Sequence, residues 1–198
     1  MTSHGQEGRT LAELVVALAC SALLLGSAAA ALAPAGRGRA VDAATRGLAT
    51  HLRALALEAV TDGRARAIVF PTDADEPFAE ARDGDGDGLS RRDVQDGIDV
   101  RLARYALARD FPDVEIGIPA WPGLRDLPPG GGPLDAGEPA VRFGRARMAV
   151  LTPEGHATPG SLFVTDGETA LCALVINGAT ARVQAWCWDR GAARWRRR

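Results

Sequence analysis

The segment from Leu14 to Ala33 contains twenty apolar or small residues in succession and no charge, and a single carboxylate, Glu13, directly precedes it. A helix of this length, rising about 1.5 Å per residue, covers about 30 Å, which is the thickness of the hydrocarbon core of a bilayer. Ionisable groups beside such a segment are costly to keep, so they usually have a partner and a task. The sequence therefore predicts one transmembrane helix over residues 9–33, with Glu13 as its functional group. Arg9 lies before the span, which predicts a cytoplasmic N-terminus.

The residues around this carboxylate, Gly8-Arg9-Thr10-Leu11-Ala12-Glu13, resemble the type III signal of the prepilin class. The resemblance implies that residues 1–8 are a leader, that prepilin peptidase cuts between Gly8 and Arg9, and that the new amine of Arg9 is N-methylated. It also implies that Glu13 attracts the amine of a neighbouring subunit as a filament grows. Such a pair is strong in a low dielectric only when both charges are present, so an unpaired Glu13 favours docking.

Two other interpretations of the N-terminus share these residues. In a secretory signal peptide, Arg9 would be the charged region, Leu14–Leu25 the apolar core, and Ala29–Ala31 the cleavage site. A glutamate so early in the apolar stretch is unusual there, and a cleaved signal gives no reason for an amphipathic helix beyond Pro34. An ordinary single-span anchor has the predicted topology and differs only in processing.

Residues 34–62 follow as a hinge and an amphipathic helix. Pro34–Gly38 should loosen the helix, because proline removes a backbone donor and glycine costs about 1 kcal/mol relative to alanine. Apolar residues then recur at spacings of three and four up to a predicted cap at Gly63, and they draw one stripe along the helix (Val41, Ala44, Leu48, Leu52, Leu55 and Ala59). An apolar stripe of this kind must pack against another part of the protein. The later sequence predicts a β-sheet that would bury it.

Residues 63–198 are predicted to form a β-rich globular domain, which gives an α+β fold. Short apolar stretches bounded by turn residues predict strands at Arg66–Phe70 and Val114–Ile118. From Val141 onward the signals strengthen and predict an antiparallel meander (Arg147–Leu151, Ser161–Thr165, Leu171–Ile176 and Ala181–Trp188). The proline- and glycine-rich segment 119–139 is predicted to be a surface connection.

The order of a long helix followed by a β-sheet, together with the prepilin signal, is typical of pilin-like proteins. Two C-terminal stretches, Leu151–Gly155 and Thr158–Phe163, are in addition similar to the GspH/FimT family of minor pseudopilins. The resemblance implies a structural subunit of a type II secretion pseudopilus, anchored by one span in the bacterial inner membrane with its C-terminal domain in the periplasm. Its partners would be prepilin peptidase and the other minor and major pseudopilins. The alternative within the family is a FimT-like minor type IV pilin that primes pilus assembly or binds DNA.

The loop 83–99 is rich in aspartate and glycine. Three carboxylates stand at alternate positions before a glycine (Asp83, Asp85 and Asp87), as in calcium loops that supply ligands from positions one, three and five. Position twelve of such a loop, which usually supplies the last calcium ligand from a glutamate, is Val94 here. Asp93, Asp96 or Asp99 would have to supply that ligand instead. The alternative is an acidic, solvated turn without an ion, and no other cofactor is expected.

Cys172 and Cys187 lie on the two arms of the last predicted hairpin, in what should be an oxidising periplasm. With a loop at Gly178–Ala179, the register places Cys172 opposite Ala185 and Cys187 opposite Ala170. The two cysteines are then diagonal neighbours on one face of the hairpin. A longer loop or a bulge would place them directly opposite each other. The alternatives are a disulfide and two buried free thiols.

Catalysis has little support in this sequence. The three histidines (His4, His51 and His156) are scattered, no serine or cysteine motif offers a nucleophile, and no glycine-rich phosphate loop follows a strand. The chain is therefore not expected to be an enzyme.

The C-terminal tail is the one candidate for nucleic-acid binding. After Arg190 it combines four arginines with a stackable tryptophan (Arg194, Trp195, Arg196, Arg197 and Arg198). Such a tail could bind phosphate and a base of DNA. All 23 basic residues of the chain are arginine and the formal charge is −2, so arginine abundance alone is weak support. A frayed, solvated tail is the alternative.

Overall fold

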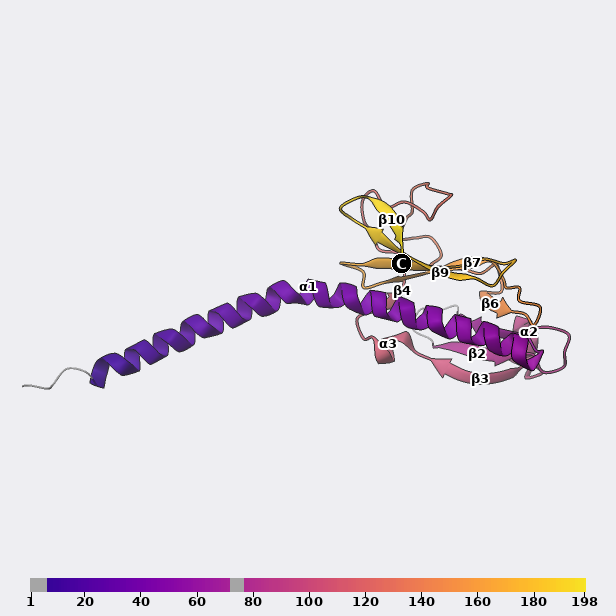
Figure 1. The fold of residues 1–198 in the computed structure, drawn as a ribbon, viewed down its shortest axis with the longest axis horizontal. Coiled ribbons are helices and arrows are strands. Elements are labelled where there is room, and N and C mark those ends of the chain that lie inside the picture. Colours follow the sequence, from indigo (N-terminus) through magenta and orange to yellow (C-terminus); the bar gives the residue numbers. More distant parts are fainter. Residues whose placement is uncertain (1–6, 72–76) are drawn as a thin grey trace, which may run out of the picture. The chain divides into compact units, whose positions relative to one another are not determined.

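The computed structural model describes the backbone of residues 7–71 and 77–198, and their side chains except at residues 7–12, 20, 22–37 and 108. The chain divides into two compact units, Met1–Gly36 and Arg37–Arg198, and both sheets belong to the second. The boundary falls inside Pro34–Gly38, where the sequence predicts a hinge. Helix α1, Glu7–Asp62, is assigned as helix on both sides of it (Figure 1). Most of the predicted leader lies outside the described residues.

Within the second unit, α1 buries the predicted apolar stripe. All six residues of the stripe are between 0% and 7% exposed, which confirms this prediction (Val41, Ala44, Leu48, Leu52, Leu55 and Ala59). The helix ends at Asp62, and Gly63 follows with a φ of +65°, the left-handed conformation expected of the predicted cap. The N–H of Arg64 donates to the carbonyl of Ala59 at 3.2 Å, so a carbonyl of the last turn is satisfied.

One antiparallel sheet has four strands in the order β3-β2-β1-β6. Its strands are β1 Arg66–Val69, β2 Phe78–Arg82, β3 Val100–Tyr105 and β6 Met148–Leu151. On central strand β1, Ile68 lies opposite Glu80 of β2 on one side and Ala149 of β6 on the other. The short helix α2, Arg91–Asp96, adds Val94 to a small buried cluster with Ala67, Ala81 and Met148.

The second antiparallel sheet has the order β10-β9-β8-β7-β4, and β5 also pairs with β7. Its strands are β4 Glu115–Ile116, β5 Val141–Arg142, β7 Gly160–Thr165, β8 Leu171–Ile176, β9 Val183–Asp189 and β10 Arg194–Arg197. Strands β7 to β10 form a meander. The prediction that Arg147–Leu151 belongs to it is wrong, because β6 pairs with β1 instead. The edge of β7 that β6 would need is occupied by β4 and β5.

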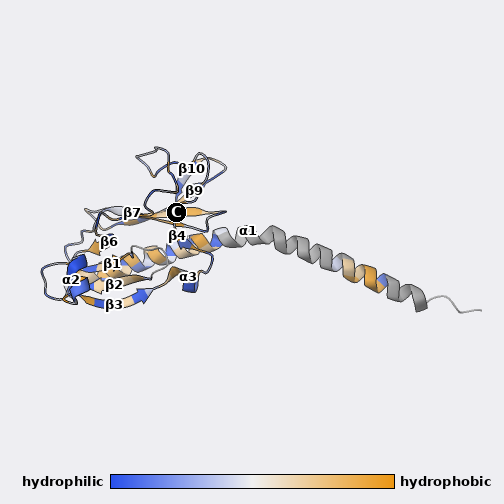
Figure 2. Ribbon diagram, turned by 180° about the vertical axis from the view of Figure 1, so that it is seen from behind, coloured by the Kyte–Doolittle hydropathy of each residue, from blue (hydrophilic) through white to orange (hydrophobic). Residues whose placement is uncertain are grey.

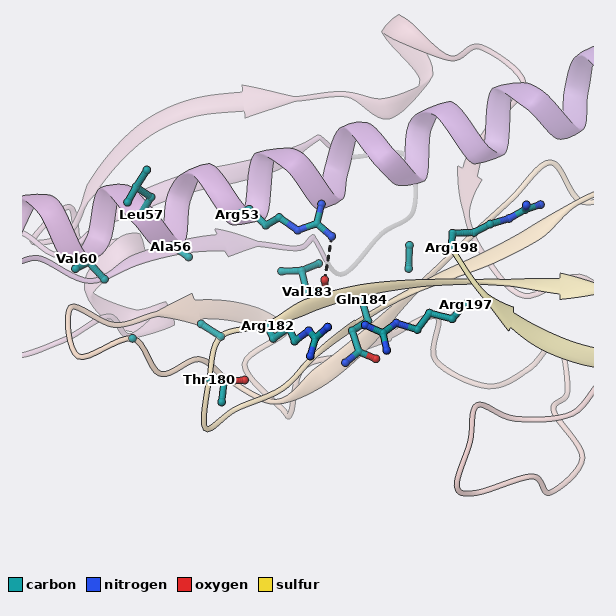
Figure 3. A pocket seen from close by; sticks show the side chains of 13 residues that line it. Arg53, Ala56, Leu57, Val60, Thr180, Arg182, Val183, Gln184, Arg197 and Arg198 are labelled. Atoms are coloured by element: carbon teal, nitrogen blue, oxygen red, sulfur yellow. Dashed lines mark hydrogen bonds between the residues drawn. The ribbon is translucent and has the colours of Figure 1, made fainter.

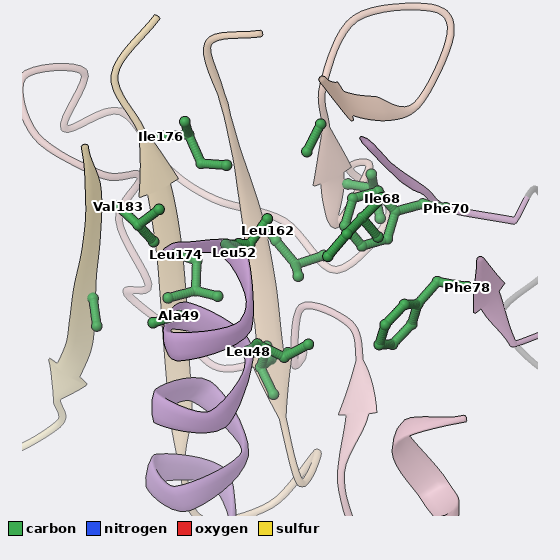
Figure 4. Close-up of a cluster of buried hydrophobic side chains, with 14 of the residues drawn as sticks. Leu48, Ala49, Leu52, Ile68, Phe70, Phe78, Leu162, Leu174, Ile176 and Val183 are labelled. Atoms are coloured by element: carbon green, nitrogen blue, oxygen red, sulfur yellow. The ribbon is translucent and has the colours of Figure 1, made fainter. Parts of the chain in front are cut away.

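The main core lies where the helix contacts both sheets (Figure 4). Leu48 and Leu52 of α1 belong to one buried cluster with Ile68 of the first sheet and with Leu162 and Leu174 of the second. In the aromatic part of this core, the rings of Phe70 and Phe143 are stacked at 5.5 Å between centroids. The helix thus joins two sheets that lack a continuous ladder between them in the described part of the chain.

The second sheet is covered on its other face as well. Side chains alternate along β7, so that Leu162 faces the helix and Phe163 faces away from it, in a second cluster with Leu124, Leu134 and Trp195. Leu124 and Leu134 belong to the segment 119–139, which the sequence predicts to be a surface connection. This segment is therefore a second layer of the core, which explains why β7 and β8 are buried almost without interruption.

Gly160 at the start of β7 has no room for a side chain. A Cβ atom there would lie 2.3 Å from the carbonyl oxygen of Arg142 and 2.4 Å from Cδ1 of Phe143. Packing thus explains why this position of the stretch Thr158–Phe163 is a glycine, because the missing side chain lets β5 approach β7.

The observed fold is α+β with antiparallel sheets, as predicted. The predicted strands at Arg66–Phe70 and Val114–Ile118 correspond to β1 and β4, each shorter than expected. Strands β2 and β3 and the short helix α3, Leu107–Asp110, have no counterpart among the predictions.

Candidate functional site

The described beginning of α1 is apolar around its whole circumference. Leu14, Val15, Val16 and Leu18 are between 57% and 67% exposed. Successive residues of a helix point about 100° apart, so these four side chains and the exposed Ala17 between them lie on all sides of the axis. Figure 2 shows this short stretch of α1 in the colour of apolar residues. A helix that is hydrophobic on every side is typically buried, in the core of a large protein or in a membrane.

The polar groups of this stretch are few. Ser21 donates its hydroxyl to the carbonyl of Ala17 at 2.7 Å, so the helix satisfies this side chain by itself. Glu13 is exposed and is the one charged side chain that the structure describes between residues 13 and 21. At the predicted cleavage site, the structure describes the backbone of Gly8 and Arg9 but not the side chain of Arg9. Among the residues that the structure describes, no helix has both the length and the apolar character needed to cross a bilayer.

The aspartate loop gathers three of its carboxylates. Oxygens of Asp83, Asp85 and Asp87 lie within 4.8 Å of one another, and only Asp83 is buried. Asp93 instead accepts from the hydroxyl of Ser90 as part of the N-cap of α2, and Asp96 forms an ion pair with Arg92 at 3.5 Å. Of the six candidate ligands named from the sequence, the structure therefore brings three together.

The inner carboxylates of this loop already have partners from the backbone. Asp83 accepts from the N–H groups of Gly86 at 2.7 Å and Gly88 at 3.3 Å, and buried Asp99 accepts from Gly84 and Ser90. A calcium ion takes six to eight oxygens, whereas the exposed carboxylates left here are those of Asp85 and Asp87. The described geometry suits a hydrogen-bonded acidic turn, and calcium binding stays a prediction.

The exposed carboxylates of Asp85 and Asp87 repel each other. The pKa of Asp87 is raised, first by a side-chain hydrogen bond with Asp85 and then by the charge of that neighbour. A cation near the pair would relieve this repulsion.

A disulfide joins Cys172 of β8 to Cys187 of β9, and both residues are buried. The predicted register is wrong, because Cys172 lies directly opposite Cys187 while Ala185 lies opposite Leu174. The connection runs from Asn177 to Arg182 and is longer than the two-residue loop assumed, with Ala181 at a φ of +49°. The longer loop shifts the register so that the two cysteines are directly opposite each other.

Reduction of this disulfide is expected to lower the free energy of unfolding. The bridge closes a loop with a sequence separation of 15. Loss of such a cross-link costs about 3 kcal/mol. Urea unfolding with and without dithiothreitol measures the difference, and the double variant Cys172→Ser/Cys187→Ser should unfold at the midpoint of the reduced protein whatever the redox conditions. The unreduced, denatured chain should show one reactive thiol, that of Cys20, and three reactive thiols would contradict the bridge.

The C-terminal residues form a strand and not a frayed tail. Strand β10 pairs with β9, and Trp195 lies opposite Trp188. Trp195 is 8% exposed, and its indole N–H donates to the carbonyl of Arg125 at 2.8 Å. This burial contradicts the expectation that Trp195 can stack on a base. Arg196 is paired with Asp189 at 2.7 Å, while Arg194, Arg197 and Arg198 are exposed.

Sequence reasoning missed one feature near this strand. Arg197 and Arg198 line a groove together with Arg53 of α1 and Arg182, which precedes β9. Arg53 could have been noticed because it lies next to the apolar stripe, but its distance in sequence from Arg197 hides the grouping.

Comparisons of the chain with protein families, with curated proteins and with solved structures find no match.

Proposed function

We propose that this chain is a minor pseudopilin, a structural subunit of a type II secretion pseudopilus that takes part in protein export. The observation that carries the proposal is the exposed stretch Leu14–Leu18, which is apolar on every side and is headed by Glu13. The amphipathic half of the same helix is buried in an antiparallel α+β body. An apolar helical segment that precedes a folded domain in the chain fits a subunit that passes from a bilayer into a filament of like helices.

The body of the protein agrees with a periplasmic location. A buried disulfide forms and persists in oxidising compartments, and the bacterial periplasm is one of them. In this proposal residues 9–33 lie in the inner membrane, and the unit Arg37–Arg198 lies on the periplasmic side. Arg9 before the apolar run gives the same orientation.

Assembly would proceed through one charge pair. Prepilin peptidase cuts between Gly8 and Arg9 and frees an amine, which is then methylated and keeps its positive charge. The carboxylate of Glu13 in one subunit attracts this amine of a neighbour within the apolar surroundings of the helices. An isolated charge there is costly, so the pair favours the docked subunit over the lone one.

Mass spectrometry of the mature N-terminus tests the proposal. We expect the chain purified from its native membrane to begin at a methylated Arg9. Gly8→Leu should leave the leader attached, whereas Gly5→Leu, a matched change inside the leader, should be processed normally. A chain that begins between Ala29 and Ala35 indicates a secretory signal peptide, and a chain that keeps residues 1–8 indicates an ordinary anchor. Either result would overturn the proposal.

A further inference from the structure

A groove of about 660 Å³ runs between the second half of α1 and the start of β9, and four arginines line it (Figure 3). They come from three parts of the chain, and all four are exposed (Arg53, Arg182, Arg197 and Arg198). Leu57 and Val60 of the helix add an apolar wall and are 68% and 52% exposed. The groove therefore offers positive charge and apolar surface side by side.

Arg53 is held in place by the edge of the second sheet. Strand β10 covers β9 as far as Arg197, which lies opposite Trp186, and the N–H of Arg198 then donates to Ala185. Beyond that point the carbonyl of Val183 is left without a strand partner on this edge, and Nη2 of Arg53 donates to it at 3.0 Å, as the dashed line in Figure 3 shows. One guanidinium of the groove is thus fixed before any ligand arrives.

The four arginines of the groove form no ion pair in the described part of the molecule. Among the described residues, no carboxylate lies within 4.0 Å of the guanidinium of Arg53, Arg182, Arg197 or Arg198. Arg66 and Arg142, by contrast, each contact more than one acidic residue. A concave surface lined by one sign of charge concentrates ligands of the opposite sign.

The same chain carries an acidic surface that has no cationic partner among the described residues. Asp85 and Asp87 are exposed at the tip of the aspartate loop, and no described arginine lies within 4.0 Å of either carboxylate. Arg64, the arginine nearest to this loop in the hydrogen-bond network, donates to the carbonyls of Asp83 and Gly84 instead of to a carboxylate.

We propose that the arginine groove of one copy receives the Asp83–Asp87 loop of a second copy. Charge complementarity selects this occupant, because each surface supplies the charge that the other lacks. A base of nucleic acid fits less well, since the groove has no aromatic lining residue and Trp195 is buried. Each copy carries both surfaces, so the contact can close into a reciprocal pair or repeat head-to-tail from copy to copy. Its place in a filament depends on the proposed function, whereas the contact itself does not.

Complementary charge swaps test the contact with the processed full-length chain in mild detergent and EDTA. Arg182→Glu/Arg197→Glu changes the groove, and Asp85→Arg/Asp87→Arg changes the loop, while Arg53 stays intact. Because electrostatic complementarity fixes partner choice, we expect each variant alone to self-associate at least about tenfold more weakly in sedimentation velocity, and an equimolar mixture of the two to regain association. Added salt should weaken association of the unchanged chain.

The control is a swap of two exposed residues outside both surfaces, Arg145→Glu/Asp113→Arg, which should associate like the unchanged chain. Circular dichroism checks that every variant is folded. Unaltered association of either surface variant, or a mixture that fails to recover, overturns the contact. So does a groove that binds a single-stranded oligonucleotide while the chain shows no self-association. Failure of the processing test leaves these results unaffected, so the two proposals can fail separately.

Discussion

Replacing Glu13 with glutamine should remove the subunit from the filament while leaving its processing between Gly8 and Arg9 intact. Glutamine keeps the size and the hydrogen-bonding capacity of the side chain but removes the charge that attracts the amine of the neighbour. Loss of one partner of a buried charge pair costs about 3–5 kcal/mol, so incorporation should fall by well over about tenfold. Immunoblots of sheared filaments against the membrane fraction measure the incorporated share.

Glu7→Gln provides the matched control for this experiment, because Glu7 belongs to the predicted leader and would be absent from the mature subunit. It should incorporate like the unchanged protein. Mass spectrometry of the accumulated Glu13→Gln chain separates the assembly step from cleavage. Equal incorporation of the Glu13→Gln and unchanged subunits would remove the role assigned to this carboxylate.

Replacing Leu52 with alanine should destabilise the folded body by about 2–5 kcal/mol, the range found when a large buried side chain is truncated in a tight core. Leu52 is 1% exposed and belongs to the cluster that α1 forms with both sheets. The free energy of unfolding in urea, followed by circular dichroism, gives the measurement.

The control variant is Leu57→Ala, the same change on the same helix. Leu57 is 68% exposed, so its truncation should alter the free energy of unfolding by less than about 0.5 kcal/mol. Similar effects of the two substitutions would mean that the stripe including Leu52 does not face the core.

The helix and the last hairpins could be predicted from the sequence because their signals are local. The stripe that includes Leu52 repeats with the helical period, and Gly63 marks its end. Strand β3, in contrast, is mostly exposed and carries arginines at Arg101 and Arg104, so it lacks the alternation that identifies a half-buried strand. The pairing of β6 with β1 joins residues far apart in sequence, and no local pattern encodes that choice.

The candidate sites also divide into those with a local sequence signal and those that depend on contacts between distant residues. Glu13 and the apolar run after it are adjacent in sequence and could be found by reading it. The pairing of Cys172 with Cys187 depended on the length of one loop, which the turn residues alone did not fix. The arginine groove combines Arg53 with Arg182 and Arg197, and only the packing of α1 beside β9 brings them together.

The segment 119–139 has a practical consequence for protein engineering. By composition it looks like a connection that could be shortened or replaced by a flexible linker. Yet Leu124 and Leu134 are buried against the second sheet, and the backbone of Arg125 accepts the indole proton of Trp195. Trimming it would uncover Phe163 and release the C-terminal strand, so shortened versions of this protein should aggregate unless these residues are kept.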